Sequence, residues 1–349
     1  MKLTREEHRS LYEQMQKEDV PCSLCDSRQQ VEILDLDKNG MPLRTVICGR
    51  CGFIFTNPRP TEKEMLAFYR TTYRGFYTGA SDPAKDYNPD SRVYKRAKWI
   101  CDFTLRHLRG RQAEDIRILD VGCASGILLN LLGQSLPAAE LYGIEPTDSF
   151  AAYARENTRA KIFSGQCHAL NHYKTPLNRR MDVVTLVHVL EHMYNPVQKL
   201  REIGEFLTDG GLLVVEVPNI LHRDCDAPIK KVHIDHVSQF IPSTLRRALT
   251  QAGFEVLDEF TDTYAPGKRH AMTFAARKNV RLSGERPFPF LTANEFEAIY
   301  DVVKKKFVLR VNKTKDAPAK KKLTLWSRLK RKAGQLRKGA NPEHSRSSE

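Results

Sequence analysis

Two acidic residues and a turn of small residues have the types and spacing needed to bind a nucleoside. Arg117–Leu129 (RILDVGCASGILL) reads as an apolar strand, a tight turn and an apolar helix. Gly122 and Gly126 allow the turn, and the free N–H groups at the start of the helix favour a carboxylate or phosphate there. A second predicted strand ends at Glu145, 23 residues after Gly122, where a carboxylate can accept hydrogen bonds from both ribose hydroxyls. The pattern predicts a nucleoside site at the ends of two neighbouring strands.

The spacing of the glycines distinguishes between two classes of nucleoside cofactor. A dinucleotide fingerprint needs G-x-G-x-x-G, and its second and third glycines would fall on Ala124 and Ile127. The sequence Asp120-x-Gly122-x-Ala124-x-Gly126 instead resembles motif I of class I S-adenosylmethionine (SAM)-dependent methyltransferases, with alanine in place of the middle glycine. The alternative is an ordinary strand–turn–helix without a ligand, which an acid at the end of the second strand disfavours.

The resemblance to these methyltransferases implies a set of cofactor contacts. The turn would bind SAM through its backbone, Glu145 would bind the ribose, and Asp120 would fix the turn or meet the methionine amine. Residues after the third predicted strand usually touch the adenine in this fold, which makes Gln166, Cys167 and His168 candidates. The predicted cofactor-binding residues are Asp120, Gly122, Cys123, Gly126, Glu145, Pro146, Gln166, Cys167 and His188.

A second motif, His188–His192 (HVLEH), begins at the end of the fourth predicted strand (181–188). It resembles the HVLEH signature of a large subgroup of SAM-dependent methyltransferases, in which this segment borders the sulfonium and the substrate. A metal site with His188 and His192 one helical turn apart is an alternative, although the sequence offers no evident third ligand.

A third group of polar residues, His233–Phe240 (HIDHVSQF), follows the fifth predicted strand. Ligands of open α/β sheets bind at this carboxyl edge. The segment resembles the Tyr-His-Glu-His segment of deoxysugar C-methyltransferases, which also carry an N-terminal zinc knuckle. Aligned on the last histidine, His233 takes the tyrosine position and Ile234 takes that of the histidine usually assigned as base. This replacement favours methylation of a hydroxyl group over methylation of a ketosugar carbon.

The remaining polar residues of this segment are the catalytic candidates. His236 with Asp235, or His233, could remove a hydroxyl proton as methyl transfer begins. The alternative is that these residues cap a helix and fix a loop.

Four cysteines have the spacing of a structural zinc site. Cys22 and Cys25 form one C-x-x-C pair, and Cys48 and Cys51 form a second pair after 22 intervening residues. Each pair would bind the metal from a tight knuckle, with a hairpin between the pairs. Four thiolates leave no open position for water, so Zn²⁺ here is predicted to be structural and to stabilise a segment too short to build its own core. The alternative is four unligated thiols.

These sites need a framework, and predicted strands alternate with helices along the middle of the chain. This order and the resemblance imply an α/β architecture: a seven-stranded Rossmann-like class I methyltransferase fold with a small N-terminal zinc-binding domain and a basic C-terminal tail. The predicted parts are a zinc-knuckle domain (1–60), a helical linker or lid (61–112), the methyltransferase domain (113–278), a helical extension (279–312) and a basic tail (313–349).

Positive charge is concentrated at the C-terminal end of the chain. The net charge is +14, and residues 313–349 carry twelve Lys or Arg against three Asp or Glu, a net of +9. Within this tail, Leu325, Leu329 and Leu336 share one predicted helical face beside Trp326, as in a basic amphipathic helix on an anionic membrane surface. Nucleic acid is a less favoured partner for this charge, and a solvated tail is a further alternative.

The remaining features indicate a compartment and a function. No apolar run approaches the roughly 20 residues that span a bilayer, and the N-terminus lacks the apolar segment of a signal peptide. We therefore expect a cytoplasmic protein that associates peripherally with the inner face of the membrane through its tail. The predicted function is SAM-dependent methyl transfer to a sugar or lipid-linked glycan, at a hydroxyl, in surface polysaccharide or modified-sugar synthesis. RNA methylation and a catalytically inactive SAM-fold scaffold are the alternatives.

Overall fold

The computed structural model describes most of the chain up to residue 303. The described residues are 5–37, 41–71, 82–108, 116–167, 173, 177, 180–222, 232–261, 271–279, 291–292 and 295–303. The predicted basic tail (313–349) with its amphipathic helix and the adenine candidate His168 lie outside these ranges.

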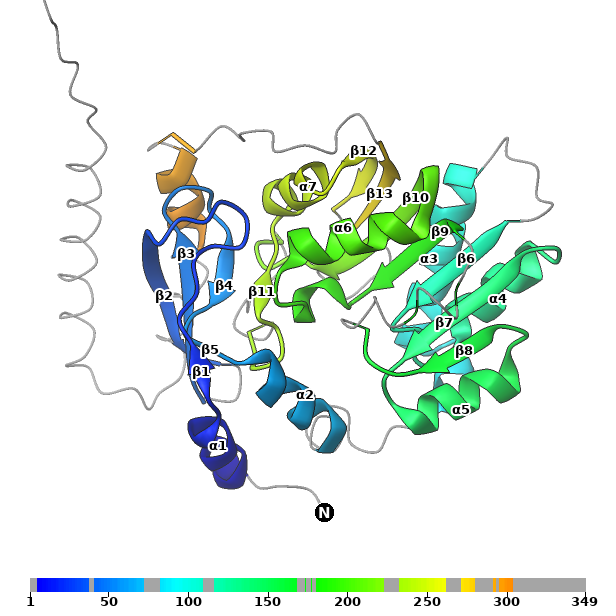
Figure 1. Cartoon of the computed structure of the whole chain (residues 1–349), viewed down its shortest axis with the longest axis horizontal. Helices are drawn as coiled ribbons and strands as arrows, with labels where there is room; N and C mark the ends of the chain where they lie inside the picture. Colours follow the sequence, from blue (N-terminus) through cyan, green and yellow to red (C-terminus); the bar gives the residue numbers. More distant parts are fainter. Residues whose placement is uncertain are drawn as a thin grey trace, which may run out of the picture.

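Seven strands form the central sheet, in the order β12-β13-β10-β9-β6-β7-β8 (Figure 1). The pairs from β10 through β8 are parallel, whereas β13 is antiparallel to both of its neighbours. This strand order confirms the predicted class I methyltransferase fold. The strands are β6 (Arg117–Val121), β7 (Glu140–Glu145), β8 (Lys161–Ser164), β9 (Met181–Val187), β10 (Leu207–Pro218), β12 (Phe254–Phe260) and β13 (Ala271–Lys278).

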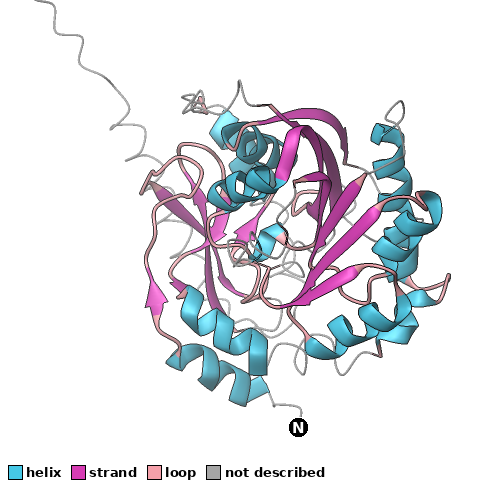
Figure 2. Cartoon of the chain, turned by 45° about the vertical axis from the view of Figure 1, so that its right-hand side comes forward, coloured by secondary structure: helices cyan, strands magenta, loops and turns pink. Residues whose placement is uncertain are grey.

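Alternate residues of the same strands are buried on opposite faces of the sheet. Ile118 and Val183 belong to one core, whereas Leu119 and Val184 belong to the other, as the two-residue period of a strand requires. Figure 2 shows helices on both sides of the sheet. The Leu119 side is covered by α6 (Pro196–Phe206) and α7 (Pro242–Gln251), and the Ile118 side by α3 (Arg92–Leu108), α4 (Ile127–Ser135) and α5 (Asp148–Asn157).

A second sheet has four strands in the order β11-β4-β3-β2. Cys22 and Cys25 precede β2, Cys48 ends β3, and Cys51 lies between β3 and β4. We call residues 15–60 together with β11 (Ser238–Gln239) the cysteine unit. Most of it is N-terminal, but β11 comes from the segment after β10 and pairs antiparallel with β4. Its other strands are β1 (Lys17–Glu18), β2 (Gln30–Leu36), β3 (Pro42–Cys48), β4 (Ile54–Thr56) and β5 (Arg59–Pro60); α1 (Arg5–Gln14) precedes it, and α2 (Glu62–Thr71) and the short helix η2 (Pro83–Tyr87) follow it.

The cysteine unit shares a hydrophobic core with the central sheet. Phe53 and Phe55 belong to the same buried cluster as Leu119 and the inner residues of α6 and α7. The rings of Phe53 and Phe240 lie 5.5 Å apart, centroid to centroid, at this junction. On its outer side, Ile299 of the helix at 295–303 packs near Gly52. The unit is therefore supported from both sides.

Within the described ranges, the structure contains no helix with the length and apolar character that crossing a bilayer requires.

Candidate active site

The turn after β6 has the shape that its small residues predict. Gly122, Ala124 and Gly126 all have positive φ values, of 79°, 48° and 79°. A Cβ on Gly122 would lie 2.5 Å from Val189 Cγ2, so this glycine is needed both for its backbone conformation and for the close approach of the His188–His192 segment. The turn and that segment are therefore adjacent at the carboxyl edge of the sheet.

Glu145 lies buried at the end of β7 and connects two backbone segments. Its Oε2 accepts a hydrogen bond from the N–H of Ala124 at 3.0 Å, and its Oε1 accepts one from the N–H of Thr147 at 2.9 Å. Each carboxylate oxygen can accept more than one hydrogen bond. Glu145 is therefore fixed beside the turn and retains acceptor capacity for a ligand hydroxyl.

Asp120 lies buried at the end of β6, where its Oδ1 accepts a 2.6 Å hydrogen bond from the hydroxyl of Thr185 on β9. Burial raises the pKa of Asp120 to about 7, and the charge of Glu145 adds to the effect, while the Thr185 hydrogen bond opposes it. Near neutral pH this carboxyl can therefore be neutral or charged, and a cation placed beside it would favour the charged form.

Two thiols lie near these carboxyls. Burial and the charges of Asp120 and Glu145 raise the pKa of both Cys123 and Cys167 well above the ordinary thiol value. Both side chains therefore stay protonated and are poor nucleophiles. Of the other predicted cofactor residues, Pro146 is exposed directly after β7, and Gln166 is half-buried after β8.

His188 contacts two buried carboxylates. It has a φ of 57°, its Nδ1 lies 3.1 Å from Glu191 Oε1, and its Nε2 lies 3.2 Å from Glu216 Oε1. His192, on the short helix η4 (Leu190–His192), instead directs its Nδ1 to the backbone oxygen of Asp235, 2.9 Å away. The two histidines of the HVLEH motif therefore have different partners.

The structure brings the three catalytic candidates together in one buried cluster with two residues of the HVLEH motif. We call this group of five the imidazole–carboxylate cluster. His233 Nδ1 contacts Asp235 Oδ1, and the His236 ring lies 3.6 Å from the His233 ring and 4.7 Å from the His192 ring, centroid to centroid. Its members are Glu191, His192, His233, Asp235 and His236.

The cluster has the composition of an acid–base site. Burial alone would raise the pKa of Glu191, but the hydrogen bond with His188 and the charges of His188 and His192 outweigh burial and hold this pKa below its ordinary value. Glu191 therefore stays a carboxylate, and its Oε1 lies 3.9 Å from His236 Nε2. A carboxylate at that distance stabilises a protonated imidazole.

The predicted alternative of a metal between His188 and His192 does not match the candidate metal groups of the described residues, because His188 belongs to none of them. The ligand atoms of Glu191, His192 and His236 lie within 4.8 Å of one another, as do those of His233, Asp235 and His236. Glu191 and His236 are the neighbours of His192 that the sequence could not place. This arrangement suits either a bound cation or a shared proton.

Glu216 is a further buried acid that sequence reasoning did not assign. It is fully buried on β10, and its Oε1 lies 3.4 Å from Nε of Arg96, while its Oε2 accepts a 3.1 Å hydrogen bond from the hydroxyl of Thr273. These contacts give the buried Glu216 side chain a guanidinium and a hydroxyl as partners inside the sheet. The available signal was an acid within the apolar run 212–218.

The four cysteines converge as their spacing predicts. The β2–β3 hairpin brings the pairs together, with Cys22 Sγ 3.4 Å from Cys51 Sγ and Cys25 Sγ 3.5 Å from Cys48 Sγ. Zn–S bonds of about 2.3 Å in a tetrahedron place sulfurs roughly 3.8 Å apart, whereas a disulfide needs about 2.05 Å. The donor set and its spacing therefore fit Zn²⁺.

Solved structures of low similarity include methyltransferases. The chain is similar to the plantazolicin methyltransferase BpumL in complex with SAH, with 14% identity and a TM-score of 0.46, covering 62% of this chain and 94% of that one. A SAM-dependent methyltransferase from Clostridium acetobutylicum ATCC 824 has 12% identity and a TM-score of 0.43, covering 56% of this chain and 97% of that one.

Curated relatives are also methyltransferases. A ubiquinone biosynthesis O-methyltransferase of Rhizobium etli (strain CIAT 652) is 24% identical over 143 residues, which cover 41% of this chain and 57% of the relative. One of Azoarcus sp. (strain BH72) is 26% identical over 207 residues, covering 53% and 81%. The chain thus spans little more than half the length of the first of these two relatives.

The family comparison agrees with the strand order. Residues 93–259 match the family described as "Methyltransferase domain". This segment contains β6 to β10, the turn, the HVLEH motif and the imidazole–carboxylate cluster. The strand order of the sheet is that of the class I methyltransferase fold, and residues 93–259 match a methyltransferase domain.

Proposed function

We propose that this protein transfers the methyl group of SAM to a hydroxyl of a sugar or glycan, in surface polysaccharide or modified-sugar synthesis. One observation carries the proposal. The turn of motif I lies against the HVLEH segment, since a Cβ added to Gly122 would come within 2.5 Å of Val189 Cγ2, and this segment contributes Glu191 and His192 to the imidazole–carboxylate cluster. A cofactor on the turn would therefore have an acid–base group on its acceptor side.

On the cofactor side, the backbone of Gly122, Cys123 and Gly126 would hold SAM, and Glu145 would accept hydrogen bonds from its ribose. Asp120 would bind the methionine ammonium group of SAM, because a cation beside Asp120 stabilises the charged form of this carboxyl group. Bound SAM would supply a methyl group on a sulfonium, and its demethylated product, a neutral thioether, is a good leaving group. The protein therefore mainly positions the reactants and removes one proton.

On the acceptor side, His236 would take the hydroxyl proton. Glu191 remains charged beside it and stabilises the imidazolium that forms, while Asp235 orients the His233 and His192 rings on either side. An imidazole held between carboxylates is suited to accept a proton near neutral pH.

The choice of an oxygen acceptor has two supports. The segment at 233–236 has Ile234 where its deoxysugar C-methyltransferase counterpart has the usual base, and the two curated relatives are named O-methyltransferases. The sugar itself rests on the resemblance of the 233–240 segment and the cysteine pairs to deoxysugar C-methyltransferases. A lipid-linked glycan would also give the basic tail a role.

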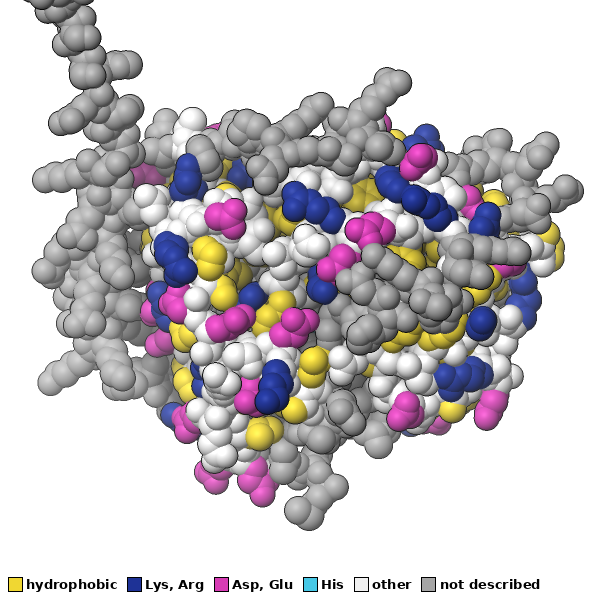
Figure 3. Space-filling view, viewed as in Figure 1, with side chains coloured by type: hydrophobic (Ala, Val, Ile, Leu, Met, Phe, Trp, Pro, Cys, Tyr) yellow, Lys and Arg dark blue, Asp and Glu magenta, His cyan; other side chains and the backbone are white. Residues whose placement is uncertain are grey.

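The cysteine unit would bind one structural Zn²⁺ through Cys22, Cys25, Cys48 and Cys51, without taking part in the reaction. For RNA as acceptor, the face in Figure 3 offers little support, since Lys and Arg side chains are interspersed there with Asp and Glu and form no single basic surface.

Methyl-labelled SAM offered to the protein with extracted glycans or with RNA tests the proposal. We expect label in the glycan fraction as an alkali-stable methyl ether. Label in RNA would establish the competing substrate, and heat of SAM binding without transfer to either would indicate a scaffold. Calorimetry that detected NAD but neither SAM nor its demethylated product would overturn the cofactor assignment.

A further inference from the structure

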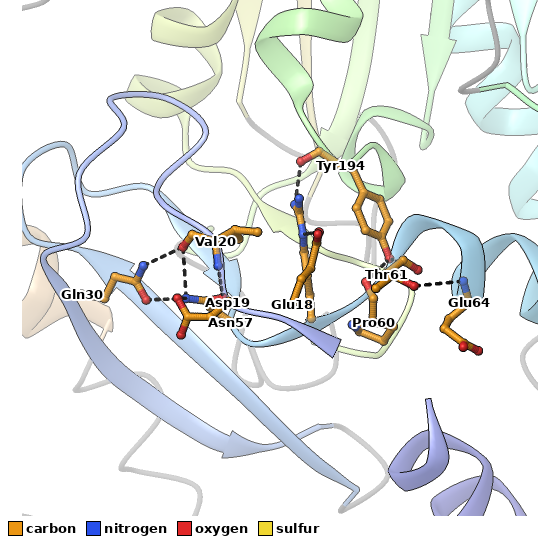
Figure 4. A network of polar contacts seen from close by, with 10 residues as sticks. Glu18, Asp19, Val20, Gln30, Asn57, Pro60, Thr61, Glu64 and Tyr194 are labelled. Carbon is orange, nitrogen blue, oxygen red and sulfur yellow. Dashed lines mark hydrogen bonds and ion pairs between the residues drawn. The ribbon is translucent and has the colours of Figure 1, made fainter. Parts of the chain in front are cut away.

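The cysteine unit contacts the chain directly after the HVLEH motif. The hydroxyl of the buried Tyr194 donates to the backbone oxygens of Pro60, at 2.6 Å, and Thr61, at 3.2 Å (Figure 4). In return, Arg59 Nη1 donates to the backbone oxygen of Tyr194 at 2.6 Å, and its guanidinium lies 4.4 Å from the centroid of the tyrosine ring. Tyr194 is thus held by both its side chain and its backbone, two residues after His192.

This contact is connected to the cysteine cluster through Asn57. The N–H of Val20 donates to Asn57 Oδ1 at 3.0 Å, and Asn57 Nδ2 donates to the Val20 oxygen at 3.2 Å and to Gln30 Oε1 at 2.7 Å (Figure 4). Val20 is two residues before Cys22, and Asn57 is two residues before Arg59. The position of the first cysteine pair therefore affects the position of β5.

A second contact follows the 233–236 segment. The N–H of Thr56 donates to the oxygen of Val237 at 3.1 Å, and β4 pairs with β11. β4 begins three residues after Cys51. Gln239 of β11 also donates from its side chain to the backbone oxygen of His236 at 3.0 Å. The second cysteine pair is therefore connected to the other half of the imidazole–carboxylate cluster.

We infer that the cysteine unit is a positioning domain of the acceptor site, in which the metal at the four cysteines fixes β4 and β5 and these strands hold both halves of the imidazole–carboxylate cluster together. Tyr194 and Gln239 are its positioning residues. The inference rests on the proposed function in one respect, namely that the acceptor binds beside the imidazole–carboxylate cluster. The cofactor side is built from β6, β7 and β9, and the hydrogen bonds of Asp120 and Glu145 named above lie within the central sheet and its turns.

Hydrogen exchange on the full chain tests the inference, with zinc-loaded protein compared with chelator-treated protein. We expect amides of 188–194 and 233–240 to exchange at least about tenfold faster after chelation, while amides of 120–127 change less than about twofold. Unchanged exchange in 188–194 and 233–240 would overturn the inference. So would a loss of protection throughout the chain, because the cofactor side would then depend on the metal equally.

A variant tests the same contact with the metal in place. Tyr194→Phe keeps the ring and removes the hydroxyl that binds Pro60 and Thr61. We expect faster exchange in 188–194, unchanged zinc content, and a rise in KM for the acceptor that exceeds the change in SAM affinity. Tyr142→Phe is the matched control, since the Tyr142 hydroxyl donates to Glu140 on β7 at 2.6 Å, and it should leave 188–194 unchanged. Equal effects of the two variants would contradict the role of Tyr194.

The two proposals fail in different ways. Absence of SAM binding by calorimetry would reject the proposed function and leave the exchange result unaffected. Normal SAM binding and transfer with metal-independent exchange at 188–194 and 233–240 would reject the positioning role alone.

Discussion

Glu145 lies where two backbone segments and a ligand would meet, so its charge has a measurable effect. Glu145→Gln keeps one acceptor oxygen for a backbone N–H but removes the charge that strengthens hydrogen bonds to the ribose. Hydrogen bonds to charged groups contribute about 1.5–3 kcal/mol, so we expect the Kd for SAM to rise roughly 10- to 100-fold by calorimetry. Glu140→Gln, at the other end of β7, is the control and should bind SAM normally. Equal affinities of Glu145→Gln and wild type would contradict the ribose assignment.

Asp120 makes the stability of the chain depend on pH. Its pKa is raised to about 7 from 3.8, mainly by burial, so the folded state holds this proton more tightly than the unfolded state. The free energy of unfolding contributed by this group therefore falls as the pH rises from about 4 to about 7 and levels off above that. We expect Asp120→Asn to remove a decrease of about 2 kcal/mol between pH 5.5 and 7. Urea unfolding of both proteins across this range measures it, and parallel pH profiles would contradict it.

At the scale of elements, two glycines with different surroundings give opposite predictions. Gly122 has a positive φ, and an added Cβ would lie 2.5 Å from Val189, whereas a Cβ added to Gly204 in α6 would meet Phe254 Cζ at 3.6 Å, an ordinary van der Waals contact. We expect Gly122→Ala to destabilise the protein by roughly 2 kcal/mol or more, through strain and overpacking. Gly204→Ala should stabilise it by up to about 1 kcal/mol, because alanine favours the helix.

Thermal unfolding of the two glycine variants at one pH measures this difference. SAM binding separates a local effect of Gly122→Ala from a global one, since the turn should lose affinity even where the chain is still folded. If both variants shift the Tm in the same direction, the close approach of the turn to the HVLEH motif is not a constraint on stability.

The elements differ in how far the sequence could predict them. The strands β6, β7 and β9 are apolar runs of five to seven residues bounded by turns, so local pattern and the motif I resemblance were sufficient. β11 has only two residues, Ser238 and Gln239, and forms because β4, some 180 residues earlier, offers a free edge. A pairing of that kind has no local signal.

The residues of the site also divide into those that local sequence pattern could place and those that depend on long-range contacts. The acids Asp120 and Glu145 could be placed because each ends a predicted strand. The contact of Glu191 and His192 with His236 could not be predicted. The two segments are separated along the chain by α6 and β10, and they come together only in the folded structure. Sequence reasoning therefore found the members of the imidazole–carboxylate cluster in two separate motifs, without the contacts that give it an acid–base character.

At the scale of the whole molecule, the cysteine unit and the central sheet share a hydrophobic core. Phe53 of β4 and Phe240, directly after β11, pack on each other, and the helix at 295–303 covers the cysteine unit from outside. A change at the four cysteines should therefore reach the acceptor side through packing as well as through hydrogen bonds. The tail beyond residue 303 lies outside the described residues, so its role must be argued from sequence.

The basic tail is the part of the chain that we expect to bind an anionic membrane surface. Residues 323–349 carry seven Lys or Arg against two Asp or Glu, with Leu325, Trp326 and Leu329 at helical spacing. Each basic residue near an anionic bilayer contributes about 1 kcal/mol, so deleting 323–349 should reduce binding to anionic liposomes about 100-fold or more while the Kd for SAM stays the same.

Liposome sedimentation at two salt concentrations measures the effect of the tail, and a second variant distinguishes its causes. Leu325→Ser with Leu329→Ser keeps every charge and removes the apolar face, so an amphipathic helix predicts loss of most binding, whereas purely electrostatic attraction predicts little change and stronger salt dependence. Unchanged partitioning of the deletion variant would reject the membrane role. Binding of RNA by the wild type, lost in the deletion and accompanied by no liposome binding, would assign the tail to nucleic acid instead.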